Sequence, residues 1–383
     1  MNGQTIGKRL EELRAPVGFD YLRIGLSVAV LLFHAVVTSY GRTVESALVW
    51  DTLLGSVVRM ILPMFFALSG FLVAGSIFRS GTTVGFVLLR ALRLLPALTV
   101  EVIISALIIG TVFTTLPLAE YLSSRATWTY FANILGRIHY QLPGVFQSNP
   151  DPTAVNMSLW TIPYELECYL ALIFLMVTRL VKMRAAVVAI TSLTCVAMFA
   201  GAMIQTEPVV LRAIDARALI VCFLAGVSIY LYRDRIKLSL PAFLACTVVS
   251  VALLGWNESS MLTPPLIAYL TVYLGMTNPP KNKIIASGDY SYGIYLYAYP
   301  IQQAVSYYPE LRHWWINVLI TLPASFLCAL FSWHCVEKHV LKYKKAIAGA
   351  QAPLPRLESW ALGHTARGWR AISRRHVATP EQQ

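Results

Sequence analysis

Two titratable side chains stand at the ends of an uncharged, mostly apolar run near the start of the chain. The run RIGLSVAVLLFH begins with Arg23 and ends with His34. In a helix, eleven residues make three turns plus about 20° and rise roughly 16 Å, so both side chains would lie on one face. Imidazole is a natural general base for a hydroxyl, and a guanidinium can hold an anionic ligand.

Other candidate groups sit in or beside apolar runs. Arg90 and Arg93 occupy positions i and i+3 of LLRALRLLPA, where two guanidinium groups on one helix face suit phosphate oxygens. An ordinary basic flank of a membrane span would explain the same pair. Glu165, in SLWTIPYELECYL, is costly inside a span unless it is paired or faces a wet cavity.

Hydroxyl groups complete the set of candidates, and each has a simpler explanation. Ser69, in FFALSGFL, is more typical of close helix packing. Tyr292 belongs to the run DYSYGIYLYAYPIQQ, which suits a polar cavity wall or an interfacial belt equally well. His34 could be a packing histidine that bonds a neighbouring helix, and Arg23 could be an interfacial arginine.

Long apolar helices must position these groups. The 383 residues are 57% hydrophobic and only 13% charged, with a mean hydropathy of +0.61. A soluble domain carries about twice that share of charge. We therefore predict an all-α, polytopic membrane protein with about ten transmembrane helices. The predicted spans cover residues 19–40, 53–77, 87–114, 157–178, 186–205, 211–232, 239–256, 262–277, 286–307 and 314–336.

The net charge of +12 reflects basic residues that gather on one side of these spans. The positive-inside rule explains them without a nucleic-acid partner and places both termini in the cytoplasm. We predict a cytoplasmic segment 1–18, a transmembrane domain 19–337 and a basic, disordered tail 338–383. An external loop at about 115–156 could cover an outer cavity or lie at the interface. The six cysteines lie in apolar segments without metal-ligand spacing, so we expect no metal and no disulfide framework.

Taken together, the motifs resemble the acyltransferase-3 family of bacterial membrane O-acyltransferases. The resemblance rests on the Arg-x10-His run, FFALSGFLV, LLRALRLLPA, SLWTIPYELECYL and the closing runs YSYGIYLYAYPIQQ and SWHCVEK. These stretches occur in the family's order and span about residues 18–345. The chain departs from the pattern at Ala298, where many members carry a histidine, so that position has no catalytic role here.

The resemblance implies an O-acetyltransferase of the bacterial inner membrane. Such an enzyme moves an acetyl group from acetyl-CoA to a hydroxyl of a cell-surface or lipid-linked carbohydrate. Our hypothesis makes His34 the general base, and Glu165 would orient the acceptor or stabilise the imidazolium. Ser69 or Tyr292 would donate to the oxyanion, unless Ser69 or His34 carries the acyl group covalently. The cations expected to bind the CoA phosphates are Arg23, Arg90 and Arg93.

Two other functions fit the composition. A secondary transporter that exports a sugar or lipid precursor would also have about ten spans and intramembrane charges, but it predicts internal repeats, and we find none. A non-catalytic scaffold that recruits partners through the basic tail gives no reason for Arg23 and His34 to share a helix face.

Overall fold

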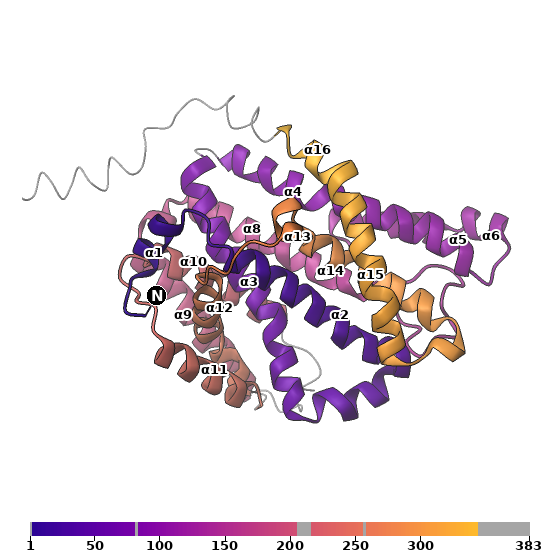
Figure 1. The fold of residues 1–383 in the computed structure, drawn as a ribbon, viewed down its shortest axis with the longest axis horizontal. Coiled ribbons are helices and arrows are strands. Elements are labelled where there is room, and N and C mark those ends of the chain that lie inside the picture. Colours follow the sequence, from indigo (N-terminus) through magenta and orange to yellow (C-terminus); the bar gives the residue numbers. More distant parts are fainter. Residues whose placement is uncertain (1, 81–82, 205–215, 256–257, 344–383) are drawn as a thin grey trace, which may run out of the picture.

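The computed structural model describes residues 2–80, 83–204, 216–255 and 258–343, which form a bundle of helices (Figure 1). The predicted all-α class is confirmed for these residues, which contain two isolated β-bridges and no strand. Six helical stretches of the described chain are long and apolar enough to cross a membrane. They run Gly18–Trp50, Leu53–Ser76, Thr83–Phe113, Met157–Val177, Arg184–Ile204 and Trp314–Val340.

Four shorter helices lie within the other four predicted spans. They contain 12 to 16 residues, fewer than the roughly 20 that cross a bilayer, so ten crossings stay a prediction. The first residues of predicted span 211–232 lie outside the described residues, as does the tail from 344 onward. The four helices are α10 (Ala216–Leu231), α11 (Leu240–Leu254), α12 (Pro264–Gly275) and α14 (Ser291–Ser306).

The long stretches are built from several consecutive elements. Three of them contain π-helical turns, at residues 46–50, 104–109 and 333–337. In Figure 1, α5 and α6 lie at one end of the bundle and α9 and α11 at the other. The remaining helices are α1 (Ile6–Leu13), α2 (Gly18–Glu45), α3 (Leu53–Ser80), α4 (Thr83–Ile103), α5 (Gly110–Phe113), α6 (Leu118–Ser123), α7 (Arg125–Thr129), α8 (Ile162–Val177), α9 (Arg184–Ile204), α13 (Lys283–Ser287), α15 (Trp314–Ser332) and α16 (Lys338–Val340).

Small residues bring α3 and α10 into close contact. A Cβ atom at Gly70 would collide with the backbone of Phe223, and one at Gly226 would collide with the backbone of Ala67. Such close backbone approach is the usual reason for small residues between membrane helices. Gly70 therefore has the packing role that the sequence favoured for the Ser-Gly pair of FFALSGFL.

Residues 115–156, predicted as an external loop, pack against helices of the bundle. Its last part runs between helices: the Asn149 side chain donates to the backbone and side-chain oxygens of Gln303, both at 2.8 Å. Asn156, fully buried, donates to Glu101 at 2.8 Å. The loop thereby brings polar side chains to α14 and α4, which a purely interfacial segment would not do.

The expected orientation can be tested with reporter fusions. We expect alkaline phosphatase to be active when fused after Ser124, in the external segment, and β-galactosidase to be active when fused after Gln383. The physical reason is that an even number of crossings leaves both termini on the basic, cytoplasmic side. Alkaline phosphatase activity after Gln383 would contradict the ten-span arrangement.

Candidate functional site

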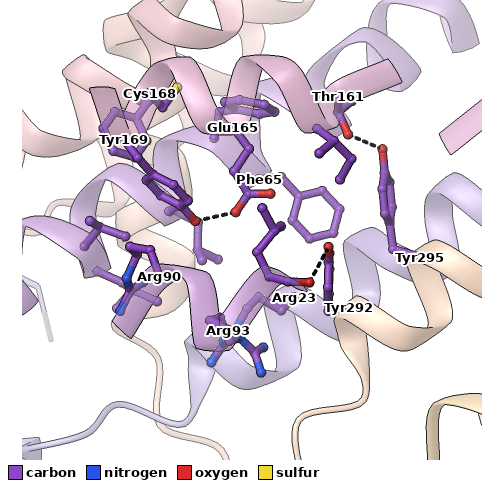
Figure 2. Close-up of a pocket in the computed structure, with 18 of the residues that line it drawn as sticks. Arg23, Phe65, Arg90, Arg93, Thr161, Glu165, Cys168, Tyr169, Tyr292 and Tyr295 are labelled. Atoms are coloured by element: carbon purple, nitrogen blue, oxygen red, sulfur yellow. Dashed lines mark hydrogen bonds between the residues drawn. The ribbon is translucent and has the colours of Figure 1, made fainter. Parts of the chain in front are cut away.

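Six of the seven predicted site residues line a single cavity, which we call the arginine pocket (Figure 2). The cavity has a volume of about 180 Å³ and lies among α2, α3, α4, α8, α10 and α14. Local sequence patterns predict no contact between these helices, so their convergence is a finding of the structure. The six residues are Arg23, Ser69, Arg90, Arg93, Glu165 and Tyr292.

Local sequence explains how α4 and α8 present their groups. The i, i+3 spacing of Arg90 and Arg93 places both guanidinium groups on the side of α4 that faces the pocket. A short 3-10 turn, Met157–Thr161, precedes α8, and the Asn156 side chain caps it by accepting from the Ser158 amide at 3.0 Å. Glu165 then falls in the first turn of α8, where the helix dipole favours a carboxylate.

An ion-pair network joins three helices at one side of the pocket. Asp289, in the loop before α14, accepts from Arg23 at 2.7 Å and from Arg93 at 2.5 Å. Arg23 also pairs with Asp20 at 2.8 Å, and Arg93 lies 3.6 Å from Glu337. Two guanidinium groups in direct contact favour the charged form of the Asp289 carboxyl. The carboxylate is therefore ionised and fixes the two arginines.

Arg90 differs from the other two arginines. It makes no hydrogen bond or ion pair to another residue of the described chain, and its Nε atom is buried without a partner. Its guanidinium lies 5.9 Å from the ring centre of Phe86 and interacts electrostatically with Glu165. Glu165 in turn accepts a hydrogen bond from the Tyr169 hydroxyl (Figure 2). Arg90 is thus the cation of the pocket that is available to an anionic ligand.

His34 is the predicted site residue that does not line the arginine pocket. It is 8% exposed, and its Nδ1 atom has no hydrogen-bond partner among the described residues. Its ring meets the ring of Tyr299 edge-on, with 5.0 Å between the centres. Glu165 lies on the pocket wall, where it contacts Tyr169, whereas His34 does not line the pocket; that Glu165 orients the acceptor or stabilises the imidazolium stays a prediction.

Sequence reasoning missed several charged residues around these groups. Asp289 appeared only as the first letter of the run DYSYGIYLYAYPIQQ, and Glu337 only as one position of SWHCVEK. Asp151, 1% exposed and bonded to Tyr299, carried no signal because it lies in a loop sequence rich in turn residues. Within the described residues, no group of three or more His, Cys, Asp or Glu side chains is placed to hold a metal ion.

Comparison with known proteins now identifies the class of enzyme. No solved structure matches the chain significantly. The sequence model of a family described as an acyltransferase domain matches residues 17–335, which is most of the chain. The chain belongs to this acyltransferase family. The ion-pair network, the pocket and His34 all fall within or beside the matched region.

Two relatives resemble the acyltransferase over nearly their full length. Nodulation protein 10 of Rhizobium leguminosarum bv. viciae is 26% identical over 355 residues, which are 86% of this chain and 94% of that protein. An O-acetyl transferase of Shigella phage Sf6 is 26% identical over 344 residues, which are 84% of this chain and 95% of that protein. Because the chain belongs to an acyltransferase family, an enzyme is favoured over the transporter and the non-catalytic scaffold.

The Asp289 network predicts a loss of stability when its central carboxylate is removed. Replacing Asp289 by asparagine leaves Arg23 and Arg93 close together without their shared partner. Breaking a fully buried ion pair costs about 3–5 kcal/mol, and because the Asp289 side chain is 23% exposed we expect roughly 2 kcal/mol. The measurement is thermal unfolding in detergent, where the variant should melt several degrees below the wild type.

The matched control is Asp51→Asn, because Asp51 is exposed and makes no ion pair with other described residues. A melting temperature for Asp289→Asn equal to that of the control would show that the network does not hold the helices together.

Proposed function

We propose that this acyltransferase moves an acetyl group from acetyl-CoA to a hydroxyl of a cell-surface or lipid-linked carbohydrate, in the bacterial inner membrane. The observation that carries the proposal is the arginine pocket, in which an unpaired guanidinium and several hydroxyls meet between apolar helices. The relative from Shigella phage Sf6 supports acetyl as the transferred group and oxygen as the acceptor atom, since it is an O-acetyl transferase.

The donor would enter the pocket from the cytoplasm with its phosphates toward Arg90. A cavity of about 180 Å³ is smaller than the roughly 300–1,000 Å³ of pockets that enclose a drug-sized ligand. It therefore suits the acetylated end of the pantetheine arm, and the nucleotide would remain outside. Arg23 and Arg93 would reach the phosphates only by exchanging their bonds to Asp289, so Arg90 makes the first contact.

His34 would act as the general base of the transfer. It would take the proton of the acceptor hydroxyl as the oxygen attacks the thioester carbonyl. A carbon–oxygen bond forms, the carbon–sulfur bond breaks, and the CoA thiolate leaves and accepts the proton from His34. Arg23 and His34 are separated by roughly 16 Å of helix, comparable to an extended pantetheine arm. Since His34 does not line the pocket, side chains between the two must move for transfer.

The other pocket residues would assist from its walls. Ser69 presents a hydroxyl that can donate to the thioester oxygen as negative charge develops on it, and Tyr292 would do so by giving up its 3.3 Å bond to the Leu94 carbonyl oxygen. Glu165 would hold Tyr169 and balance Arg90, a role that differs from stabilising the imidazolium. A direct transfer of this kind leaves no acetyl group on the protein, whereas a covalent route through Ser69 would leave a label there.

The first test is acetyl transfer by purified wild type and His34→Ala. With acetyl-CoA labelled in the acetyl group, we expect wild type to label cell-envelope glycan and release free CoA. His34→Ala should lose at least about a hundredfold in rate, because a general base contributes that much or more. His139→Ala is the control, since this loop histidine bonds Asn133 through its backbone only.

The outcomes separate the parts of the proposal. Full transfer by His34→Ala would remove the general-base role. No CoA release by wild type, together with no stabilisation by acetyl-CoA in thermal unfolding, would refute acetyl-CoA as the donor.

Arg90 gives a separate prediction about donor binding. Arg90→Ala should raise the KM for acetyl-CoA about tenfold or more, because a charge-assisted contact to phosphate is lost. Arg235→Ala is the matched control: its guanidinium also lies 5.9 Å from an aromatic ring, that of Tyr232, but outside the pocket. Steady-state kinetics on both variants decides, and equal KM values would place the CoA phosphates elsewhere.

A further inference from the structure

Three polar side chains lie around the buried His34, and with it they form what we call the His34 cluster: Arg42, Asp151 and Tyr299. The ring of Tyr299 contacts His34 edge-on, and its hydroxyl donates to Asp151 Oδ2 at 2.7 Å. Tyr299 and Asp151 are 0% and 1% exposed. A carboxylate buried this deeply is costly unless it is paired and hydrogen-bonded, and the partners of Asp151 hold it where its charge acts on the buried His34 imidazole.

The chain positions Asp151 through a tight approach of the external segment to α2. Gly41 interrupts α2 with a φ of +79°, which glycine adopts without strain. A Cβ atom there would lie 2.9 Å from the carbonyl oxygen of Pro150, so only glycine allows this approach. On the other side, the Gln303 side chain of α14 donates to the Asp151 carbonyl at 2.7 Å. Asp151 is therefore held from α2 and α14 at once.

The side chains that contact the Asp151 carboxylate among the described residues all donate hydrogen bonds to it. Thr153 Oγ1 donates to it at 2.6 Å, and Arg42 Nε lies 3.3 Å away. The Arg42 side chain is 51% exposed, so solvent weakens its charge more than that of the buried carboxylate. Asp151 and Arg42 are the charged groups that act electrostatically on His34. The buried charge of this cluster next to His34 is thus negative.

We infer that Asp151 is a positioning residue for the acyl transfer: its carboxylate, with Tyr299 between, stabilises the imidazolium that forms when His34 takes the acceptor proton. The inference rests on the proposed function and deepens it. A carboxylate that does not itself take the proton but favours the imidazolium is a known way to assist a histidine base. The proton moves from the hydroxyl to His34 and then to the departing CoA thiolate, and Asp151 takes up no proton in this sequence of steps.

The test compares Asp151→Asn and Tyr299→Phe with the wild type. Both changes keep the shape of the side chain, and neither residue lines the arginine pocket. We expect kcat to fall at least about tenfold in each variant, while the KM for acetyl-CoA and the thermal stabilisation by acetyl-CoA stay unchanged. Asp151→Glu, which keeps the charge, should recover part of the lost kcat.

Tyr297→Phe is the matched control. Tyr297 lies on the same helix, is 2% exposed and donates to the Ala97 carbonyl at 3.4 Å, away from His34 and outside the pocket lining. Its kcat should equal that of the wild type.

The results distinguish this inference from the proposed function. If the wild type transfers acetyl and Asp151→Asn keeps full kcat, or raises only the KM, the inference is overturned and the proposed function stands. If Asp151→Glu is no better than Asp151→Asn, the charge is not what matters and the inference is also overturned. A wild type that neither binds acetyl-CoA nor transfers acetyl would overturn both.

Discussion

Burying charge among apolar helices costs free energy that pairing and hydrogen bonding recover, and this constraint accounts for the ion pairs and carboxylate contacts of the described bundle. Asp289 shows it most clearly, because one carboxylate joins Arg23 of α2 to Arg93 of α4. Glu101, deep in α4, accepts from Ser105 and from Asn156 in the segment 115–156. Each contact joins parts of the chain that are distant in sequence or fixes a group within the bundle. These few polar groups therefore help to place α2, α4, α14 and the segment 115–156.

The neighbouring helices α2 and α14 supply groups to two separate polar sites. Near its start, α2 contributes Arg23 to the arginine pocket, and α14 contributes Tyr295. Further along, α2 presents His34, and α14 presents Tyr299, four residues or about 6 Å of helix beyond Tyr295. One site has an unpaired cation, and the other combines an imidazole with a buried carboxylate. The same two helices thus create two different electrostatic surroundings within the described bundle.

The sequence alone predicted the helices and much of the pocket. Helical periodicity and the cost of charge in a span singled out the i, i+3 arginines and Glu165. The structure places them in one cavity together with Tyr292. The partners of these groups could not be predicted. Asp289 lies 196 residues from Arg93 along the chain, and local spacing carries no information on such a contact. Asp151 looked like part of an ordinary loop, and only the folded chain shows it buried beside His34.

The charge balance of the pocket bears on which anions it can select. The three arginines face Asp20, Asp289 and Glu337, which pair with Arg23 and Arg93, and Glu165 lies near Arg90. A small monovalent anion could pair only with Arg90, because it would have to displace internal carboxylates from Arg23 and Arg93. A ligand with several phosphates can replace those carboxylates at once and recover the cost of separating the pairs. If the pocket binds the donor as proposed, this pairing favours a polyanion over a small monovalent anion.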